Sequence, residues 1–331
     1  MSEILAPCGA MESLTAAVSA GADAVYLGEE YFSARKNADN FTAEQLCDAV
    51  RFCHYSGVKV YVTLNTLVFD REIPLLAKAI ENCAKADVDA FIVQDMGVAR
   101  LSRQIVPELP LHASTQMTVN SPEGAIMAKE LGFTRVVLGR ELSFAQIKAI
   151  TESCDIETEL FVHGALCVCI SGQCYMSSVL GGRSGNRGLC AQPCRLDFTS
   201  GDRHNVLSLK DLSLTEKLPE LAKAGITSFK IEGRMKRPEY VAGAVNACRV
   251  ALDGGTPDLI SLKNVFSRSG FTSGYFDDDF KNMQGVRTKD DVTSATSKVL
   301  SAMKQYYHKP FRRFPADITV NVKSGQPVCY K

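Results

Sequence analysis

Short apolar runs rich in β-branched residues alternate with longer amphipathic stretches from residue 3 to about residue 252. This alternation is typical of strands that each lead into a helix, and it predicts a parallel sheet covered by helices. The predicted strands are Glu3–Ala6, Ala24–Leu27, Lys59–Asn65, Ala90–Val93, Leu111–Ala113, Arg135–Leu138, Glu159–Val162 and Ser228–Glu232. Eight such units predict a closed parallel (β/α)8 barrel of the TIM type, in the α/β class.

Several of these strands follow the same local pattern. The segments AGADAVYLG, SGVKVYVTLN, ADVDAFIVQD, LGFTRVVLGR and AGITSFKIEGR each place a helix-ending glycine, or its equivalent, directly before an apolar run. An open dinucleotide-binding sheet would instead need a GxGxxG turn after the first strand, and LAPCGAMESL does not supply one. The pattern therefore favours the barrel.

The spacing of elements predicts a division into three parts. Residues 1–255 form the barrel, residues 256–309 a helical and loop extension, and residues 310–331 the start of a further β-rich domain. The last segment, FPADITVNVKSGQPVCYK, reads as a strand, a turn and the beginning of a second strand. Because an isolated hairpin is only marginally stable, we expect the chain to be truncated and a β-rich domain to continue beyond Lys331.

The barrel contains one long insertion after its seventh strand, at residues 164–205. An insertion of this length in a compact domain is normally either functional or disordered. Its five cysteines and its apolar residues argue against disorder. We therefore predict an ordered, cysteine-rich segment above the carboxyl ends of the strands.

Charge and hydropathy narrow the cellular setting. The 37 basic and 37 acidic side chains cancel, so any polyanion has to bind at a local patch. No stretch has the features of a signal peptide, and no apolar run reaches the roughly 18 residues that span a bilayer. We predict a soluble, cytoplasmic protein with no membrane partner.

Cysteine spacing carries the strongest chemical signal. In a reducing compartment, clustered cysteines indicate a metal site rather than disulfides. The insertion places Cys167 and Cys174 in a C-x6-C pair and Cys190 and Cys194 in a C-x3-C pair. Zinc ribbons mostly use tight C-x2-C knuckles, so this looser spacing favours a four-thiolate iron–sulfur site. Cys169 is predicted to be a bystander, because alternation along an extended chain turns it away from Cys167.

Polar residues that follow the strands are the candidates for chemistry, since barrel enzymes carry their sites at the carboxyl ends of the strands. The catalytic candidates are His163, Glu232 and Arg234, and the substrate-binding candidates are Arg140, Arg183, Arg187, Gln94 and Gln116. Guanidinium groups suit carboxylate or phosphate partners. Structural alternatives stay open: His163 orients the insertion by hydrogen bonds, and Glu232 pairs with Arg234.

At this point a family resemblance emerges. The segment ELFVHGALCVCISGQCYMSS resembles the signature of the collagenase-like peptidase family U-32, and so do LAPCG, VLGREL, GRSGNRGLCAQPCR, SLKDL and FKIEGRMKRPEYV. The resemblance covers nearly the whole chain. It implies a barrel with a four-cysteine [4Fe–4S] cluster and a role in hydroxylation.

Two segments narrow the resemblance to one branch. GLCAQPC and VFSRSGFTSGYF resemble the RNA-modifying members. This implies RNA as partner, with 5-hydroxycytidine formation in large-subunit rRNA favoured over the related tRNA reaction. It also implies prephenate, a small dicarboxylate metabolite, as the hydroxyl source.

Two other functions remain as alternatives. The family name implies a collagen-degrading peptidase, but the sequence has no nucleophile elbow, triad order or HExxH motif. Only His163 beside Cys167 or Ser171 could be arranged as a dyad. The second alternative is a non-catalytic assembly protein that binds a cluster or RNA.

Overall fold

The computed structural model describes residues 2–35, 38–308, 320–322 and 329–330. Within these residues, eight parallel strands form a closed barrel, because β9 pairs with both β1 and β7. The barrel strands are β1 (Glu3–Pro7), β2 (Ala24–Leu27), β3 (Lys59–Leu64), β4 (Ala90–Val93), β5 (Leu111–Ala113), β6 (Arg135–Val137), β7 (Glu157–Ala165) and β9 (Ser228–Ile231). The predicted fold class is confirmed.

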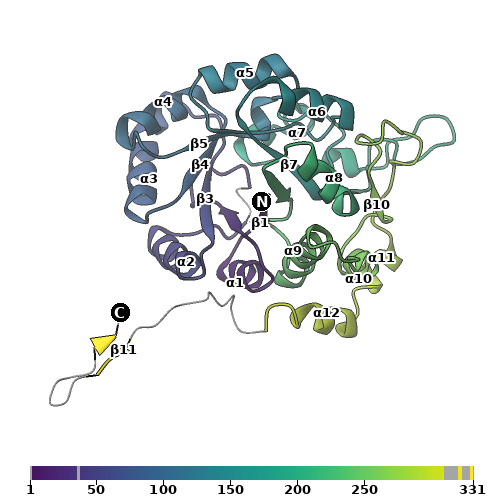
Figure 1. Ribbon diagram of the computed structural model, residues 1–331. Coiled ribbons are helices and arrows are strands. Elements are labelled where there is room, and N and C mark those ends of the chain that lie inside the picture. Colours follow the sequence, from purple (N-terminus) through teal and green to yellow (C-terminus); the bar gives the residue numbers. More distant parts are fainter. Residues whose placement is uncertain (1, 36–37, 309–319, 323–328, 331) are drawn as a thin grey trace.

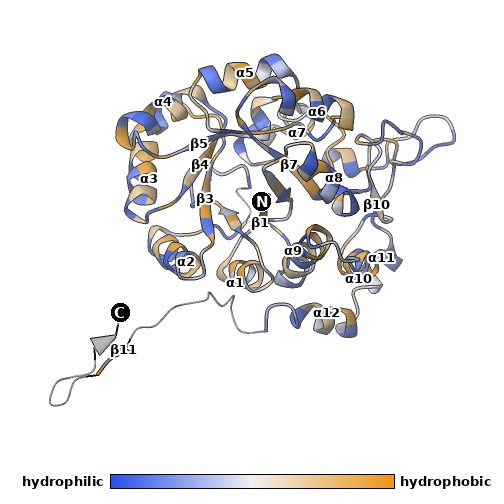
Figure 2. Ribbon diagram, viewed as in Figure 1, coloured by the Kyte–Doolittle hydropathy of each residue, from blue (hydrophilic) through white to orange (hydrophobic). Residues whose placement is uncertain are grey.

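A ring of helices surrounds the strands (Figure 1). Its members are α1 (Met11–Ser19), α2 (Ala43–Tyr55), α3 (Ile73–Lys85), α4 (Met96–Ile105), α5 (Pro122–Glu130), α6 (Phe144–Ser153), α8 (Leu218–Lys223) and α9 (Pro238–Leu252). Figure 2 shows both hydrophobic and hydrophilic residues on these helices, as expected for elements with one face on a barrel. Polar side chains at Thr42, Asp95, Ser121 and Ser143 accept hydrogen bonds from first-turn amides and fix where four of the helices begin.

The predicted helix–turn–strand pattern has a conformational basis. The residue that ends the helix before β2, β3, β6 and β9 is a glycine with positive φ, at Gly21, Gly57, Gly132 and Gly225. Before β4 the same position is Asp87, with φ of 62°. Aspartate is one of the few side-chain-bearing residues that tolerate this left-handed conformation, so it acts as the equivalent of glycine.

The amino-terminal part of the barrel interior holds a buried ionic layer. Arg135 Nη1 lies 2.7 Å from Glu3 Oε1 and 3.2 Å from Glu159 Oε2. Lys230 Nζ bonds the other oxygen, Glu159 Oε1, at 2.6 Å. Because an unpaired buried charge is very costly, this mutual pairing is what permits charged residues to point into the barrel.

The end of β7 differs from the prediction. The strand continues three residues past the expected end at Val162, and β8 (Asp211–Ser213) pairs with it in the antiparallel sense. The last two residues of the segment SLKDL, Asp211 and Leu212, belong to β8. Because β7 extends beyond its barrel neighbours, its backbone groups need partners, and β8 supplies them. The short strand β10 (Phe271–Thr272) then pairs with β8.

The remaining elements lie in the insertion and the extension. The insertion contains α7 (Met176–Gly181), and α10 (Leu259–Val265) and α12 (Ser297–Lys304) contact α9, with α11 (Lys289–Thr293) between them in sequence. Short 3-10 turns lie at Asp70–Glu72, Thr115–Met117, Gly185–Arg187, Pro193–Arg195 and Thr215–Lys217. Near the carboxyl end, β11 (Val320–Asn321) and β12 (Cys329–Tyr330) pair antiparallel, and both lie in the segment where the sequence predicted strands.

Most of the predicted β-rich region at 310–331 lies outside the described residues. The three domain boundaries therefore stay predictions. Among the described helices, none combines the length and apolar character needed to cross a bilayer.

Candidate functional site

A cavity of about 620 Å³ opens at the carboxyl ends of the barrel strands, between the strands and the insertion. Eight cationic side chains and the carboxylate Glu232 contribute to its wall. The cations are Arg35, Arg140, Arg183, Arg195, Lys230, Arg234, Lys236 and Arg268. The insertion closes the opposite side with its cysteines. The long segment between β7 and β8 thus forms one wall of the cavity, and the ends of the barrel strands form the other.

The four predicted ligand cysteines line this one cavity, at Cys167, Cys174, Cys190 and Cys194. Burial raises the pKa of the Cys194 thiol, and its three partner thiols raise it further, against the opposing effect of Arg195. The other three sulfurs therefore lie within electrostatic range of Cys194. All four are free thiols.

Cys169 does not line the cavity. Its thiol instead contacts that of Cys174 through a hydrogen bond, and burial, together with this neighbour, raises its pKa. That Cys169 lies outside the ligand set stays a prediction.

The donor set fits an iron–sulfur cluster. Cys190 Sγ accepts hydrogen bonds from the backbone N–H of Gln192 at 3.4 Å and from Ser177 Oγ at 3.9 Å. Such bonds to sulfur stabilise thiolates and tune cluster potentials. No three His, Cys, Asp or Glu side chains among the described residues lie close enough to share one metal ion. A four-iron cluster does not require this, because each of its thiolates binds a different iron.

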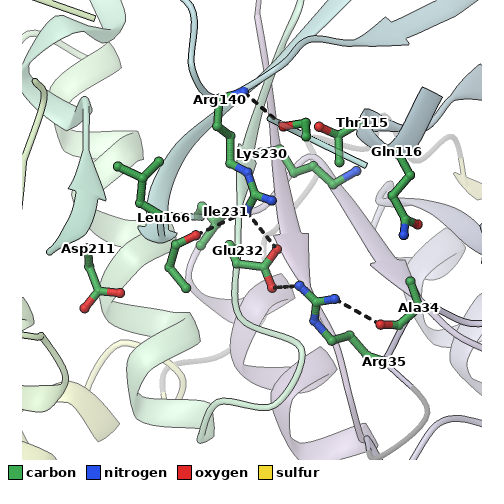
Figure 3. A network of polar contacts seen from close by, with 12 residues as sticks. Ala34, Arg35, Thr115, Gln116, Arg140, Leu166, Asp211, Lys230, Ile231 and Glu232 are labelled. Carbon is green, nitrogen blue, oxygen red and sulfur yellow. Dashed lines mark hydrogen bonds and ion pairs between the residues drawn. The ribbon is translucent and has the colours of Figure 1, made fainter. Parts of the chain in front are cut away.

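Glu232 lies between two arginines (Figure 3). Arg35 Nη2 is 3.2 Å from its Oε1, and Arg140 Nη1 is 3.9 Å from its Oε2. Burial alone would raise the pKa of Glu232, but Arg35, Arg140 and then Arg234 outweigh burial, and the pKa lies below its ordinary value. Glu232 is therefore ionised at neutral pH and already occupied by cations, which suits a positioning role better than proton abstraction.

One alternative from the sequence was that Glu232 pairs with Arg234. The structure shows no such ion pair. Arg234 Nη1 donates to Ser33 Oγ at 2.6 Å and to Thr63 Oγ1 at 2.9 Å. Burial, followed by the nearby Arg35, lowers the pKa of Arg234 to about 10. Arg35 was not among the residues predicted from the sequence, although it pairs with Glu232. Its position in the loop after the second strand was the available signal.

The cavity carries an excess of positive charge. The Arg140 guanidinium stacks over Phe161 at 4.9 Å and donates to the carbonyl of Ala165. Lys230 lies between the rings of Tyr26 and Phe161, at 4.4 and 5.4 Å. Glu232 is the only carboxylate among the residues that line the cavity. Glu159 pairs with Lys230 and Asp211 with Arg268 from outside the wall, and the wall still keeps a net positive charge. This arrangement attracts a small dianion.

The other predicted binding residues fall into two groups. Arg183 and Gln116 line the cavity, and the Gln116 Oε1 atom is buried without a hydrogen-bond partner. Arg187 and Gln94 are not part of its wall. Arg187 instead forms a two-pronged ion pair with Glu72, at 2.6 and 2.8 Å, and also bonds the carbonyl of Leu67.

His163 also lies away from the cavity. Its ring stacks on Tyr240 at 5.8 Å and meets the edge of Phe271 at 4.9 Å. Neither ring nitrogen has a hydrogen-bond partner, and burial lowers the pKa of His163 to about 4. The structure thus does not bring this predicted catalytic residue to the other candidates, and it gives the ring no hydrogen bond to the insertion.

A β-bulge explains the position of His163. In the pairing of β7 with β9, Phe161 lies opposite Lys230, whereas His163 lies opposite Ile231, so the register shifts between Phe161 and His163. Two residues apart, these side chains would ordinarily share a face, but the extra residue turns His163 outward. Sequence spacing alone could not reveal this.

The geometry does not assemble the possible peptidase dyad. Ser171 is buried, and its hydroxyl donates to Glu141 Oε2 at 2.9 Å. The backbone N–H of Ser171 donates to the other oxygen of Glu141 at 3.1 Å. The unpaired nitrogens of His163 contact neither Ser171 nor Cys167 by hydrogen bonding. The hydrogen bonds between Ser171 and Glu141 therefore connect the insertion to the loop after β6.

We expect the Arg187–Glu72 pair to hold the insertion onto the barrel. The hydrogen bond from Arg187 is the main reason that the pKa of Glu72 falls from 4.5 to about 2. Its stabilisation is thus present above about pH 4.5 and lost as pH falls through about 2. Arg187→Ala should cost about 1.5–3 kcal/mol locally and speed chymotrypsin cleavage within the insertion at neutral pH.

Arg203→Ala is the matched control, because Arg203 is an exposed arginine of the same insertion. It should leave the cleavage rate unchanged. Equal cleavage of wild type and Arg187→Ala would show that the ion pair does not anchor the insertion.

Taken together, the fold and the site define a (β/α)8-barrel protein whose mouth is walled by a thiolate-rich insertion. The model of peptidase family U32 matches residues 9–284, and the chain belongs to this family. A solved structure of the U32 peptidase Mk0906 superimposes with a TM-score of 0.50 at 16% identity, covering 72% of this chain and 95% of that one. That likeness supports the fold.

Curated relatives of this chain are named either for RNA hydroxylation or for collagenase activity. The chain is 43% identical over 284 residues to the 23S rRNA 5-hydroxycytidine C2501 synthase of Escherichia coli, covering 83% of this chain and 42% of the relative. It is 38% identical to tRNA hydroxylation protein P1 of Bacillus subtilis, covering 77% and 64%. It is also 36% identical to a protein named collagenase from Porphyromonas gingivalis, covering 83% and 73%. The chain spans less than two thirds of the first two relatives.

Proposed function

We propose that this protein hydroxylates a pyrimidine of RNA, and that its substrate is a cytidine of large-subunit rRNA. The observation that carries the proposal is the single cavity in which four cysteines meet an excess of arginine and lysine. A hydrolase of peptides needs neither feature. The names of the relatives support RNA hydroxylation, and the higher identity to the rRNA synthase favours rRNA over tRNA.

In this proposal Cys167, Cys174, Cys190 and Cys194 hold a [4Fe–4S] cluster. When bound, such a cluster supplies electron transfer or an iron that coordinates a substrate oxygen. The chain's own contribution is to orient the thiolates and shield them. Arg195 contributes to this by donating to the carbonyls of Leu166 and Leu209, which hold the carboxyl end of the insertion against the barrel.

The hydroxyl donor in this proposal is a small hydroxy-dicarboxylate of the prephenate type. In this proposal its carboxylates bind Arg140, Arg234 and Arg183, which line the cavity, and Arg35 pairs with Glu232 in the same wall. The exchange RNA–H + R–OH → RNA–OH + R–H balances atoms and electrons. The donor carbon loses its hydroxyl to C5 of the pyrimidine and gains the displaced hydrogen with two electrons, so the donor is reduced as the base is oxidised.

The test is genetic and chemical. A strain that lacks the gene for this chain should lose one hydroxypyrimidine from its rRNA, measured by mass spectrometry of digested nucleosides. The wild-type gene should restore it, and Cys174→Ala should restore less than a hundredth of it. Cys83→Ala is the matched control, since Cys83 is a buried core thiol of α3.

Two results would contradict the proposal. One is an unchanged nucleoside profile in rRNA and tRNA after deletion. The other is full restoration by Cys174→Ala. If either occurred while the purified protein cleaved a defined peptide, the peptidase function would replace this one.

A further inference from the structure

A second cavity, of about 430 Å³, lies beside the barrel mouth. We call it the Phe266 pocket, after the ring around which its cations gather. It shares Met235 and Lys236 with the main cavity, so the two are direct neighbours. None of its lining residues is a proposed cluster ligand or a ligand of the dicarboxylate.

The Phe266 pocket gathers cations around one aromatic ring. Lys236 Nζ lies 2.8 Å from the centroid of the Phe266 ring, and Arg287 Cζ lies 4.4 Å from it. Arg268 approaches the same ring at 5.4 Å, and Arg237 also lines the pocket. The negative face of an aromatic ring attracts cations without neutralising them. The ring therefore holds the positive charges together and leaves them available.

These charges are mostly uncompensated. Arg268 forms an ion pair with Asp211. No salt bridge within the described part of the chain involves Lys236, Arg237 or Arg287. Three cations without carboxylate partners are unusual in a partly enclosed site of a protein whose total charge is zero. Such a site has a strong preference for an anion.

The protonated form of Lys236 is disfavoured in this arrangement. Burial, together with the nearby Arg268 and Arg287, lowers the pKa of Lys236 to about 7, against the opposing effects of Asp211 and Glu232. An anion placed in the pocket would favour the protonated ammonium and remove this penalty. The helix α9 begins at Pro238, directly after these residues, and its dipole adds to the positive potential.

We propose that the Phe266 pocket binds a backbone phosphate of the RNA strand whose target base enters the barrel mouth. This inference rests on the proposed function, because it takes the neighbouring cavity, which holds the four cysteines and the donor's carboxylate partners, as the place where the base reacts. A phosphodiester supplies the anion that the pocket lacks, and the shared wall at Met235 and Lys236 places it next to that base. Phosphate contacts of this kind fix the register of a nucleic acid.

The experiment measures binding of a fluorescent single-stranded RNA oligonucleotide at several salt concentrations, without turnover. Arg287→Ala and Lys236→Ala should each weaken binding roughly 5- to 20-fold. Each should also reduce the slope of log K against log salt by about 0.7, the value for one lost contact to a single strand. Lys236→Arg keeps the charge and should bind within about twofold of wild type.

Arg51→Ala is the matched control, because Arg51 is an exposed arginine of α2 whose removal costs the same charge. It should change neither affinity nor slope. Inorganic phosphate and a nucleoside monophosphate, added as competitors, separate the two sources of phosphate. Displacement of the RNA only at the concentrations that ionic strength explains supports the backbone phosphate, whereas specific displacement at micromolar phosphate would overturn it in favour of a free metabolite.

Wild-type affinity and slope in both alanine variants would also overturn the inference. Its failure is distinguishable from failure of the proposed function. If the slope falls as expected but deletion of the gene leaves every hydroxypyrimidine in place, RNA binds here and the hydroxylation proposal alone is wrong.

Discussion

Cys190→Ala combined with Cys194→Ala is expected to leave the anaerobically prepared protein without bound iron and without the broad visible absorption of an iron–sulfur cluster. The reason is that both residues line the same cavity as Cys167 and Cys174, so their loss removes half of the thiolates. A four-cysteine [4Fe–4S] cluster has one thiolate on each iron, so the two remaining thiolates would leave two irons without a protein ligand. Iron and acid-labile sulfide analyses, together with the absorption spectrum, measure the effect, and iron content should fall at least tenfold.

Cys169→Ala is the informative control. It removes a thiol from the same insertion, hydrogen-bonded to Cys174 but outside the cavity wall. It should retain most of the iron. The cluster hypothesis is wrong if the double variant keeps its full iron content, or if the wild-type protein prepared without oxygen binds none.

The second large effect is on stability. Glu159→Gln should lower the free energy of unfolding by about 3–5 kcal/mol, because it breaks a buried ionic layer by removing one partner. Glu159 is fully buried, and its two oxygens bond Arg135 and Lys230. Arg135 keeps Glu3 and Glu157 as partners, but Lys230 loses its only ion pair within the described residues. Urea unfolding followed by circular dichroism measures the change.

Glu152→Gln provides the comparison, since Glu152 pairs with Lys148 on the exposed surface of α6. Surface pairs of this kind contribute at most about 0.5 kcal/mol. A loss below about 1 kcal/mol in Glu159→Gln would mean that the barrel interior tolerates an unpaired Lys230. The ionic layer would then not be a major source of stability.

Among the candidate functions, the geometry separates RNA hydroxylation from peptide hydrolysis at particular residues. Ser171 donates its hydroxyl to Glu141, and His163 faces Tyr240 and Phe271 on the outer side of β7. Ser171 and His163, the nucleophile and base of the possible dyad, therefore do not meet. The cysteines and cations of the cavity instead provide what a cluster and a dicarboxylate require, which is why the proposal builds on them.

The sequence by itself determined the barrel, the place of the insertion and the four cysteines that share a cavity. Each of these is encoded locally. Strand and helix periods are set by neighbouring residues, helix ends by a left-handed residue such as Gly21 or Asp87, and the thiols by their closeness within one segment. Local signals of this kind do not depend on how distant parts of the chain pack.

Only the tertiary structure decided which charged residues meet. Glu232 bonds Arg35, a residue 197 positions away, rather than its neighbour Arg234. Because of the bulge in β7, His163 does not face the cavity. Arg187 forms an ion pair with Glu72 and does not line the cavity. The physical reason is that long-range pairing and strand register depend on how the barrel closes. A shift of one residue reverses the side of the strand from which a side chain projects, and no local pattern in the sequence records such a shift.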